Sequence, residues 1–304
     1  MKTSQRVRLS EDLTCSRTVA GVMKWGVWGH DFSTDQLDRL IRGCLATGVT
    51  TFDHADIYGH YTTEAAFGEV LRADPSLRDR LELVSKCGIR LTGPNRPGNR
   101  AKAYETTAAY IRESVEQSRR NLTTDRLDLL LIHRPSPLLH PDEVAEVVGE
   151  LVGAGKVLHF GVSNFSPSQF ELLDGRIPLI TNQVEISALH DAALTDGTLD
   201  QCLRHRIRPM AWSPLGGGGY FGDSPSPAGQ RLRTAFDGLR ERYDDATDDQ
   251  LLLAWLHRHP AGILPVLGTG KLARIRAAVA AESIVLDSQD WFLIWEAARG
   301  HEAA

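Results

Sequence analysis

Cysteine is scarce in this chain, and the cysteines it has are far apart. The four cysteines among 304 residues are Cys15, Cys44, Cys87 and Cys202, and no two show the Cys-x-x-Cys spacing of a zinc or redox site. We therefore expect neither a disulfide framework nor a bound metal, and reduced thiols fit a cytoplasmic protein.

Long apolar runs and an excess of positive charge are also missing. No segment approaches the roughly 18 apolar residues that span a membrane, and the first residues, MKTSQRVRLSEDLT, lack the apolar core of a signal peptide. The net charge of −5 disfavours non-specific binding to nucleic acid, which requires a basic face. We expect a cytoplasmic protein that binds neither membranes nor nucleic acids.

No Pro/Gly-rich linker divides the chain, so we expect one domain over residues 1–304. Short apolar runs, each of the length of a buried strand, alternate with amphipathic stretches of helical period. The expected strands are 17–22, 49–52, 81–85, 127–132, 157–162, 180–184, 208–212 and 263–266. The expected helices are 35–47, 110–121, 142–152, 168–173, 250–258 and 274–281. Eight strands alternating with helices favour a closed (β/α)8 TIM barrel.

Two polar tracts rich in glycine and proline, 92–102 and 216–229, are expected to be long loops at the catalytic mouth. The segment 287–299 is expected to form an extra C-terminal helix. We expect that helix to pack on the barrel through Trp291, Phe292, Ile294 and Trp295.

Polar side chains follow three neighbouring expected strands, where barrels of this kind carry their chemistry. Asp53 and Tyr58 follow the second strand, Lys86 ends the third, and His133 ends the fourth. Singly, each has an ordinary structural explanation as a turn residue, a packed ring or a partner of a backbone carbonyl. Together they form an acid–base set with mutually consistent roles.

Four motifs carry a resemblance to a known family. They are G-V-T-T-F-D-H-A-D-I-Y-G (48–59), V-S-K-C-G (84–88), L-L-I-H-R-P (130–135) and G-V-S-N-F (161–165). In order and spacing they resemble the aldo-keto reductase superfamily, and their wording is most similar to bacterial oxidoreductases of the YdhF type. The resemblance implies NADPH-dependent reduction of aldehydes and ketones on a (β/α)8 barrel without metal, by a monomer that acts on a small carbonyl substrate.

The resemblance also implies a role for each residue of the set. Tyr58 is the proton donor to the carbonyl oxygen, Lys86 and Asp53 are its electrostatic partners, and His133 orients the substrate. Hydride arriving at a carbonyl carbon leaves negative charge on the oxygen, which a proton must neutralise. A free tyrosine titrates at about 10, and we expect the Lys86 ammonium to lower the pKa of the Tyr58 phenol.

The expected nicotinamide site lies at the ends of the next three strands. By resemblance, Ser163, Asn164 and Gln183 hydrogen-bond the carboxamide and Trp212 stacks on the ring, followed by Ser213. Asn164 could instead cap a helix, and Gln183 could be a satisfied polar group inside the barrel. Leu215 and Gly216 open a glycine run whose N–H groups would face the pyrophosphate, although such a run could also be a hinge.

The segment after the eighth strand resembles the family's binding site for the adenosine 2′-phosphate. Its residues are Gly268, Thr269, Gly270, Lys271 and Arg274. Gly268 stands where a clamping lysine is common in the family, and Ala277 and Ala278 stand where Glu and Asn are common. NADPH is expected because Lys271 and Arg274 offer charge for a phosphate, and NADH remains an alternative cofactor.

The expected substrate pocket is aromatic. Trp25, Trp28, His54 and Tyr61 would line its mouth, although the two tryptophans could equally pack the loop that carries them. Two other classes stay open. One is a non-catalytic, cofactor-sensing regulator, and the other is a barrel hydrolase or metal enzyme that uses the D-H-A-D sequence (53–56) together with His133.

Overall fold

The computed structural model describes residues 2–218, 220–221 and 225–302. In this part of the chain eight parallel strands close into a barrel, in the order β10-β11-β12-β3-β4-β5-β8-β9. The strands are β3 (Val19–Gly21), β4 (Thr51–Asp53), β5 (Glu82–Cys87), β8 (Leu127–Ile132), β9 (Val157–Ser163), β10 (Asn182–Glu185), β11 (Met210–Trp212) and β12 (Leu264–Leu267). The prediction of a (β/α)8 barrel is confirmed.

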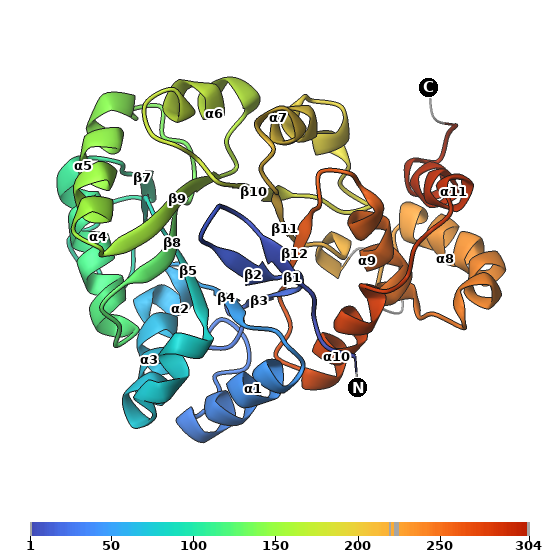
Figure 1. Ribbon diagram of the computed structural model, residues 1–304, viewed down its shortest axis with the longest axis horizontal. Helices are drawn as coiled ribbons and strands as arrows, with labels where there is room; N and C mark the ends of the chain where they lie inside the picture. Colours follow the sequence, from blue (N-terminus) through green and yellow to red (C-terminus); the bar gives the residue numbers. More distant parts are fainter. Residues whose placement is uncertain (1, 219, 222–224, 303–304) are drawn as a thin grey trace.

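Helices surround the barrel as an outer ring (Figure 1). The ring consists of α1 (Thr34–Ala46), α3 (Thr63–Ala73), α4 (Ala108–Asn121), α5 (Pro141–Gly153), α6 (Pro167–Asp174), α7 (Thr198–His205), α9 (Asp248–Arg258) and α10 (Leu272–Ala281). Their starts have local causes: Ser33 and Gln36 form a capping box at α1, and Ser166 and Gln169 form one at α6. None of the helices in the described ranges has the length and apolar character that crossing a bilayer requires.

A hairpin of β1 (Arg6–Arg8) and β2 (Thr14–Ser16) closes the N-terminal end of the barrel. Figure 1 shows it across the centre of the ring. Its apolar residues Leu9, Leu13 and Cys15 share a buried cluster with barrel residues such as Val84 and Leu129. The hairpin therefore seals the end of the barrel opposite the predicted mouth.

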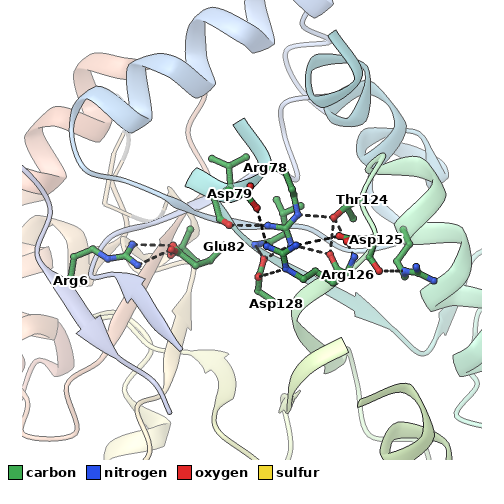
Figure 2. Close-up of polar contacts among 12 residues, drawn as sticks. Arg6, Arg78, Asp79, Glu82, Thr124, Asp125, Arg126 and Asp128 are labelled. Atoms are coloured by element: carbon green, nitrogen blue, oxygen red, sulfur yellow. Dashed lines mark hydrogen bonds and ion pairs between the residues drawn. The ribbon is translucent and has the colours of Figure 1, made fainter. Parts of the chain in front are cut away.

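Charged groups tie the same end together (Figure 2). Arg6 Nη2 on the hairpin lies 2.7 Å from Glu82 Oε1 on β5. The Arg78 guanidinium belongs to a 3-10 helix (Pro75–Arg80) and lies 2.9 Å from Asp128 Oδ2 on β8, with both side chains 9% exposed. Asp128 Oδ2 also accepts from the Leu83 N–H of β5 at 2.7 Å, so one carboxylate links a helix and two strands.

The two expected loops are partly structured. The tract 92–102 connects β6 (Ile89–Arg90) and β7 (Ala103–Tyr104), a short antiparallel hairpin beyond β5. The tract 216–229 runs into an additional helix, α8 (Pro227–Leu239), and its residues 219 and 222–224 lie outside the described residues. The expectation of a loop as far as residue 229 is therefore wrong, because Ser226 caps a helix that begins at Pro227.

The expected C-terminal helix is present as α11 (Ser288–Arg299). Trp291 stacks on Trp255 of α9 at 4.9 Å and Ile294 is fully buried, so the helix packs on α8 and α9. Phe292 is 45% exposed, so the expectation that it also packs inward is wrong. The helical period turns that position away from the buried face.

All four cysteines are buried and free. They belong to four different parts of the fold: Cys15 to the β1–β2 hairpin, Cys44 to α1, Cys87 to β5 and Cys202 to α7.

Candidate active site

The barrel brings the four expected polar residues together at the carboxyl ends of its strands. Asp53 ends β4, Lys86 lies in β5, and His133 directly follows β8. Tyr58 begins a short turn, α2 (Tyr58–Tyr61), five residues after Asp53. The order β4-β5-β8 makes these three strands neighbours, so residues far apart in the sequence, such as Tyr58 and His133, lie close together.

Lys86 is the centre of this group. Its Nζ donates to Asp53 Oδ2 at 2.6 Å, to the His54 carbonyl at 2.8 Å and to the Tyr58 hydroxyl at 3.1 Å. An ammonium has three protons, and here each has an acceptor, which is the condition for holding this charge away from water. Lys86 is 1% exposed, and its position is fixed.

The pKa values follow from burial and from these contacts. Burial lowers the pKa of Lys86, but Asp53 and Tyr58 outweigh it, so the net shift is upward and the amine stays charged. Burial raises the pKa of the Tyr58 phenol, and the charge of Lys86 offsets only part of that rise. The expected lowering of the Tyr58 pKa by Lys86 is present, but the net shift is upward, because removing a phenolate from water costs more than the ammonium returns.

His133 lies beside Tyr58. Its ring lies 6.0 Å from the Tyr58 ring in an edge-on arrangement. Burial, followed by the charges of Lys86, Arg134 and Lys102, lowers its pKa well below the usual range. His133 is therefore a neutral imidazole at physiological pH, able to share a hydrogen bond without adding charge.

The residues expected around the nicotinamide form one hydrogen-bonded group. Ser163 Oγ donates to the Gln183 carbonyl at 2.7 Å, and Asn164 Nδ2 donates to Ser163 Oγ at 2.8 Å. Trp212 Nε1 donates to Asn164 Oδ1 at 2.9 Å. Gln183 Nε2 donates to Asp53 Oδ1 at 2.8 Å, which links this group to the Lys86 carboxylate.

Two residues of the expected cofactor site, Asn164 and Ser213, have strained backbones. Asn164 has φ 62° and Ser213 has φ 49°, in the left-handed region that non-glycine residues rarely adopt. Asn164 is not a helix cap, since Ser166 caps α6. Such strain is concentrated at binding and catalytic sites.

The loop after β11 passes close to its neighbours. Gly216 has φ +72°, and a Cβ there would lie 2.6 Å from Leu189 Cδ1, so no larger residue fits without a shift. Leu215, one residue earlier, packs against the core.

The expected phosphate segment lies at the start of α10. Thr269 Oγ1 accepts from the Lys271 N–H at 3.1 Å, and Lys271 is the N-cap residue of the helix, without a side-chain cap. The side chains of Lys271 and Arg274 are exposed and form no ion pair within the described ranges. Gly268 is exposed, and Gly270 lies where a Cβ would meet Phe32 at 2.7 Å. Free helix N–H groups beside two uncommitted cations fit a phosphate.

The four residues expected to line the pocket divide into two pairs. Trp28 lies at the mouth, its ring 6.2 Å from that of Tyr58, and Tyr61 is half-buried beside the 92–102 loop. Trp25 is fully enclosed and donates through Nε1 to the Thr269 carbonyl, and His54 is fully enclosed with its ring 4.6 Å from that of Phe67. The structure does not bring Trp25 or His54 to the mouth.

His54 and Asp56, which the metal-enzyme alternative requires, do not join Asp53. The His54 ring nitrogens have no partner in the described structure, and burial lowers its pKa to about 3. Among the described residues no group of three or more His, Cys, Asp or Glu side chains is arranged so that it could hold a metal ion.

Two residues that the sequence analysis did not single out contact the turn that follows Tyr58. Asn95 donates to the His60 carbonyl, and the Arg96 guanidinium lies over the Tyr61 ring. The signal available in the sequence was the position of their loop directly after the strand that carries Lys86.

Known proteins are similar to this chain in sequence and in fold. A model of the Aldo/keto reductase family matches residues 18–299. Oxidoreductase YdhF of Escherichia coli strain K12 is 50% identical over 289 residues, covering 94% of this chain and 95% of the relative. A 6-dehydroglucose reductase of Agrobacterium fabrum is 45% identical over 302 residues, covering 99% of this chain and 100% of the relative.

A solved structure of an aldo/keto reductase is similar to this chain in fold. It is the crystal structure of an aldo/keto reductase from Klebsiella pneumoniae in complex with NADP and acetate. The two chains superpose with a TM-score of 0.73 at 27% identity, over 95% of this chain and 93% of the other.

The family match and the oxidoreductase relatives identify the chain as an NAD(P)H-dependent oxidoreductase. The chain belongs to the aldo/keto reductase family.

Proposed function

We propose that this enzyme reduces aldehydes and ketones to alcohols with NADPH, and that Tyr58 is the proton donor. The observation that carries the proposal is the bond of the buried Lys86 Nζ to both the Tyr58 hydroxyl and Asp53. When bound, the nicotinamide supplies the hydride. The remaining steps belong to the side chains of the chain itself.

The protonated phenol is ready to act. Burial keeps the Tyr58 pKa above its ordinary value, so the hydroxyl carries its proton at neutral pH and can donate it to a carbonyl oxygen. The phenolate that forms lies 3.1 Å from an ammonium, which stabilises the new charge. Asp53 keeps that ammonium charged and in place, and the neutral His133 offers a second hydrogen bond to the substrate oxygen.

The chain also has residues that would bind each part of the cofactor. Ser163, Asn164 and Gln183 would bind the carboxamide, and the face of Trp212 would support the ring. The backbone of Ser213, Leu215 and Gly216 would follow the pyrophosphate. Gly268, Thr269, Gly270, Lys271 and Arg274 would receive the adenosine phosphate, which is the feature that favours NADPH over NADH.

The 45% identity to a 6-dehydroglucose reductase makes a sugar aldehyde the first natural substrate class to test. The physical requirement is the same for any aldehyde: the carbonyl oxygen must reach both Tyr58 and His133.

The test compares Tyr58→Phe with Tyr104→Phe, which removes the hydroxyl of an exposed tyrosine on β7. We expect Tyr58→Phe to lower kcat for NADPH-dependent reduction of 4-nitrobenzaldehyde by about 10²-fold or more. Its NADPH affinity, followed by nicotinamide fluorescence, should stay close to that of the wild type. Wild-type turnover in Tyr58→Phe would rule out the proton-donor role, and NADPH binding without any turnover by the wild type would favour a regulator.

A further inference from the structure

The three residues after Tyr58 have an unusual backbone. Gly59 has φ 59° and ψ 34°, His60 has φ 55° and ψ 46°, and Tyr61 has φ 70°, so three consecutive residues are left-handed. Glycine adopts this conformation freely, but His60 and Tyr61 carry a Cβ that opposes it. A turn of this kind persists only when its surroundings hold it.

Part of that support is local. Thr62 Oγ1 donates to the Gly59 carbonyl at 2.6 Å, which closes the turn on itself. The Trp28 ring lies 5.2 Å from the His60 ring in an edge-on arrangement. These contacts restrain the turn from the side of Trp28 and from within.

The 92–102 loop and Leu91, the residue before it, supply contacts from another part of the fold. Asn95 Nδ2 donates to the His60 carbonyl at 2.8 Å. The Tyr61 hydroxyl accepts from the Leu91 N–H at 2.8 Å, and the Arg96 guanidinium lies 4.4 Å from the centre of the Tyr61 ring. Both left-handed residues that carry a side chain are thus held by this loop.

The loop is itself anchored. Asn99 Nδ2 donates to the Leu91 carbonyl at 2.9 Å, and Arg90 Nη1 donates to Asn99 Oδ1 at 3.2 Å. Arg90 ends β6, which begins two residues after β5, the strand of Lys86. One stretch of chain therefore carries Lys86 and continues into the loop that holds the Tyr58 turn.

We infer that Asn95 and Arg96 are positioning residues for the proton donor, acting through His60 and Tyr61 to keep the Tyr58 hydroxyl on the Lys86 amine. This inference rests on the proposed function. Neither residue touches the reacting atoms in this arrangement. Asn95 holds the backbone of His60 and Arg96 holds the ring of Tyr61, both in the turn that follows Tyr58.

The experiment uses Asn95→Ala, Asn95→Gln and Arg96→Leu in the full-length enzyme. Arg100→Ala is the matched control, since Arg100 is an exposed residue of the same loop and forms no hydrogen bond or ion pair within the described ranges. For each protein, kcat and KM for 4-nitrobenzaldehyde and the Kd for NADPH are measured.

We expect Asn95→Ala and Arg96→Leu each to lower kcat by about 10- to 100-fold, because a displacement of about 1 Å at a reacting group has an effect of that size. The Kd for NADPH should change less than about two-fold. Asn95→Gln, which retains an amide donor, should recover part of the loss, and Arg100→Ala should behave like the wild type.

A second background separates positioning from general stabilisation of the mouth. In Tyr58→Phe the proton donor is absent, so Asn95→Ala should have no further effect on the residual rate. Wild-type kcat in Asn95→Ala, or an equal loss in the Tyr58→Phe background, overturns the inference while the proposed function stands. A wild-type protein without turnover on any carbonyl overturns the proposed function and, with it, this inference.

Discussion

At the scale of single residues, burial moves the pKa of the Asp56 carboxyl far from its ordinary value. Asp56 is 7% exposed and borders a cavity of about 60 Å³, with one carboxyl oxygen lacking any partner in the described structure. Burial, followed by the negative charge of Glu64, raises its pKa well above 3.8. The folded protein therefore holds a proton on Asp56 that the unfolded chain releases above its ordinary pKa.

This difference has a sign that can be tested. Above about pH 4 the unfolded state binds one proton fewer than the folded state, so the free energy of unfolding falls as pH rises towards the folded pKa. An amide has nearly the shape of a protonated carboxyl and does not titrate. We expect Asp56→Asn to gain stability relative to the wild type as pH rises from 4.5 to 7, at up to about 1.4 kcal/mol per pH unit. Urea unfolding curves across this range measure it, and parallel pH profiles for the two proteins would contradict the shifted pKa.

At the scale of elements, the Arg78–Asp128 pair joins a 3-10 helix to two barrel strands at the closed end (Figure 2). Removing one member of a buried pair leaves the other charge without compensation, at a cost of about 3–5 kcal/mol. We expect Arg78→Met to lower the free energy of unfolding by that amount. Its activity under conditions where it stays folded should be normal, because the pair lies at the end of the barrel opposite Tyr58.

The matched control for this pair is on the surface. Arg112→Gln breaks the Arg112–Glu150 ion pair, whose side chains are 46% and 51% exposed, and such pairs contribute about 0–1 kcal/mol. Chemical unfolding of both variants and the wild type gives the comparison. Equal losses in Arg78→Met and Arg112→Gln would show that the buried pair is not a structural tie.

The barrel strands could be predicted because a buried strand appears in the sequence as a short run of mostly apolar residues. The expected strand 127–132 coincides with β8, where all six residues are buried. The β1–β2 hairpin left no such mark, because each strand has three residues and Arg6–Arg8 is largely exposed. Helix α8 was missed as well, since the glycine- and proline-rich tract before it continues into its first turn.

The active-site elements divide in the same way. Asp53, Lys86 and His133 could be placed together because parallel strands end on one side of a barrel. The enclosure of Trp25 and His54 could not be foreseen, since it depends on how the loops after β3 and β4 fold over the barrel. Likewise, the sequence gives the identity of Asn95 but not its bond to the His60 carbonyl, which requires two loops to meet.

At the scale of the whole molecule, the single-domain expectation and the proposed cofactor can be tested together. We expect one cooperative unfolding transition in calorimetry, shifted upward by NADPH, because a ligand at 100 times its Kd adds about 2.7 kcal/mol to the folded state. At equal concentration NADH should shift it less.

Arg274→Gln should abolish the difference between the two cofactors. Arg276→Gln, which changes an exposed arginine of the same helix, should keep that difference. Two resolved transitions would contradict the single domain, and equal shifts in the wild type would contradict the NADPH preference.

The burial of every cysteine gives this enzyme an internal set of reporters. Burial raises the pKa values of Cys15, Cys44 and Cys202 to about 12, so the folded protein offers a maleimide almost no reactive thiolate there. Each thiol becomes modifiable only when its own segment opens. Timed alkylation followed by peptide mass mapping would therefore rank the opening of the sealing hairpin, α1, β5 and α7 without any introduced label.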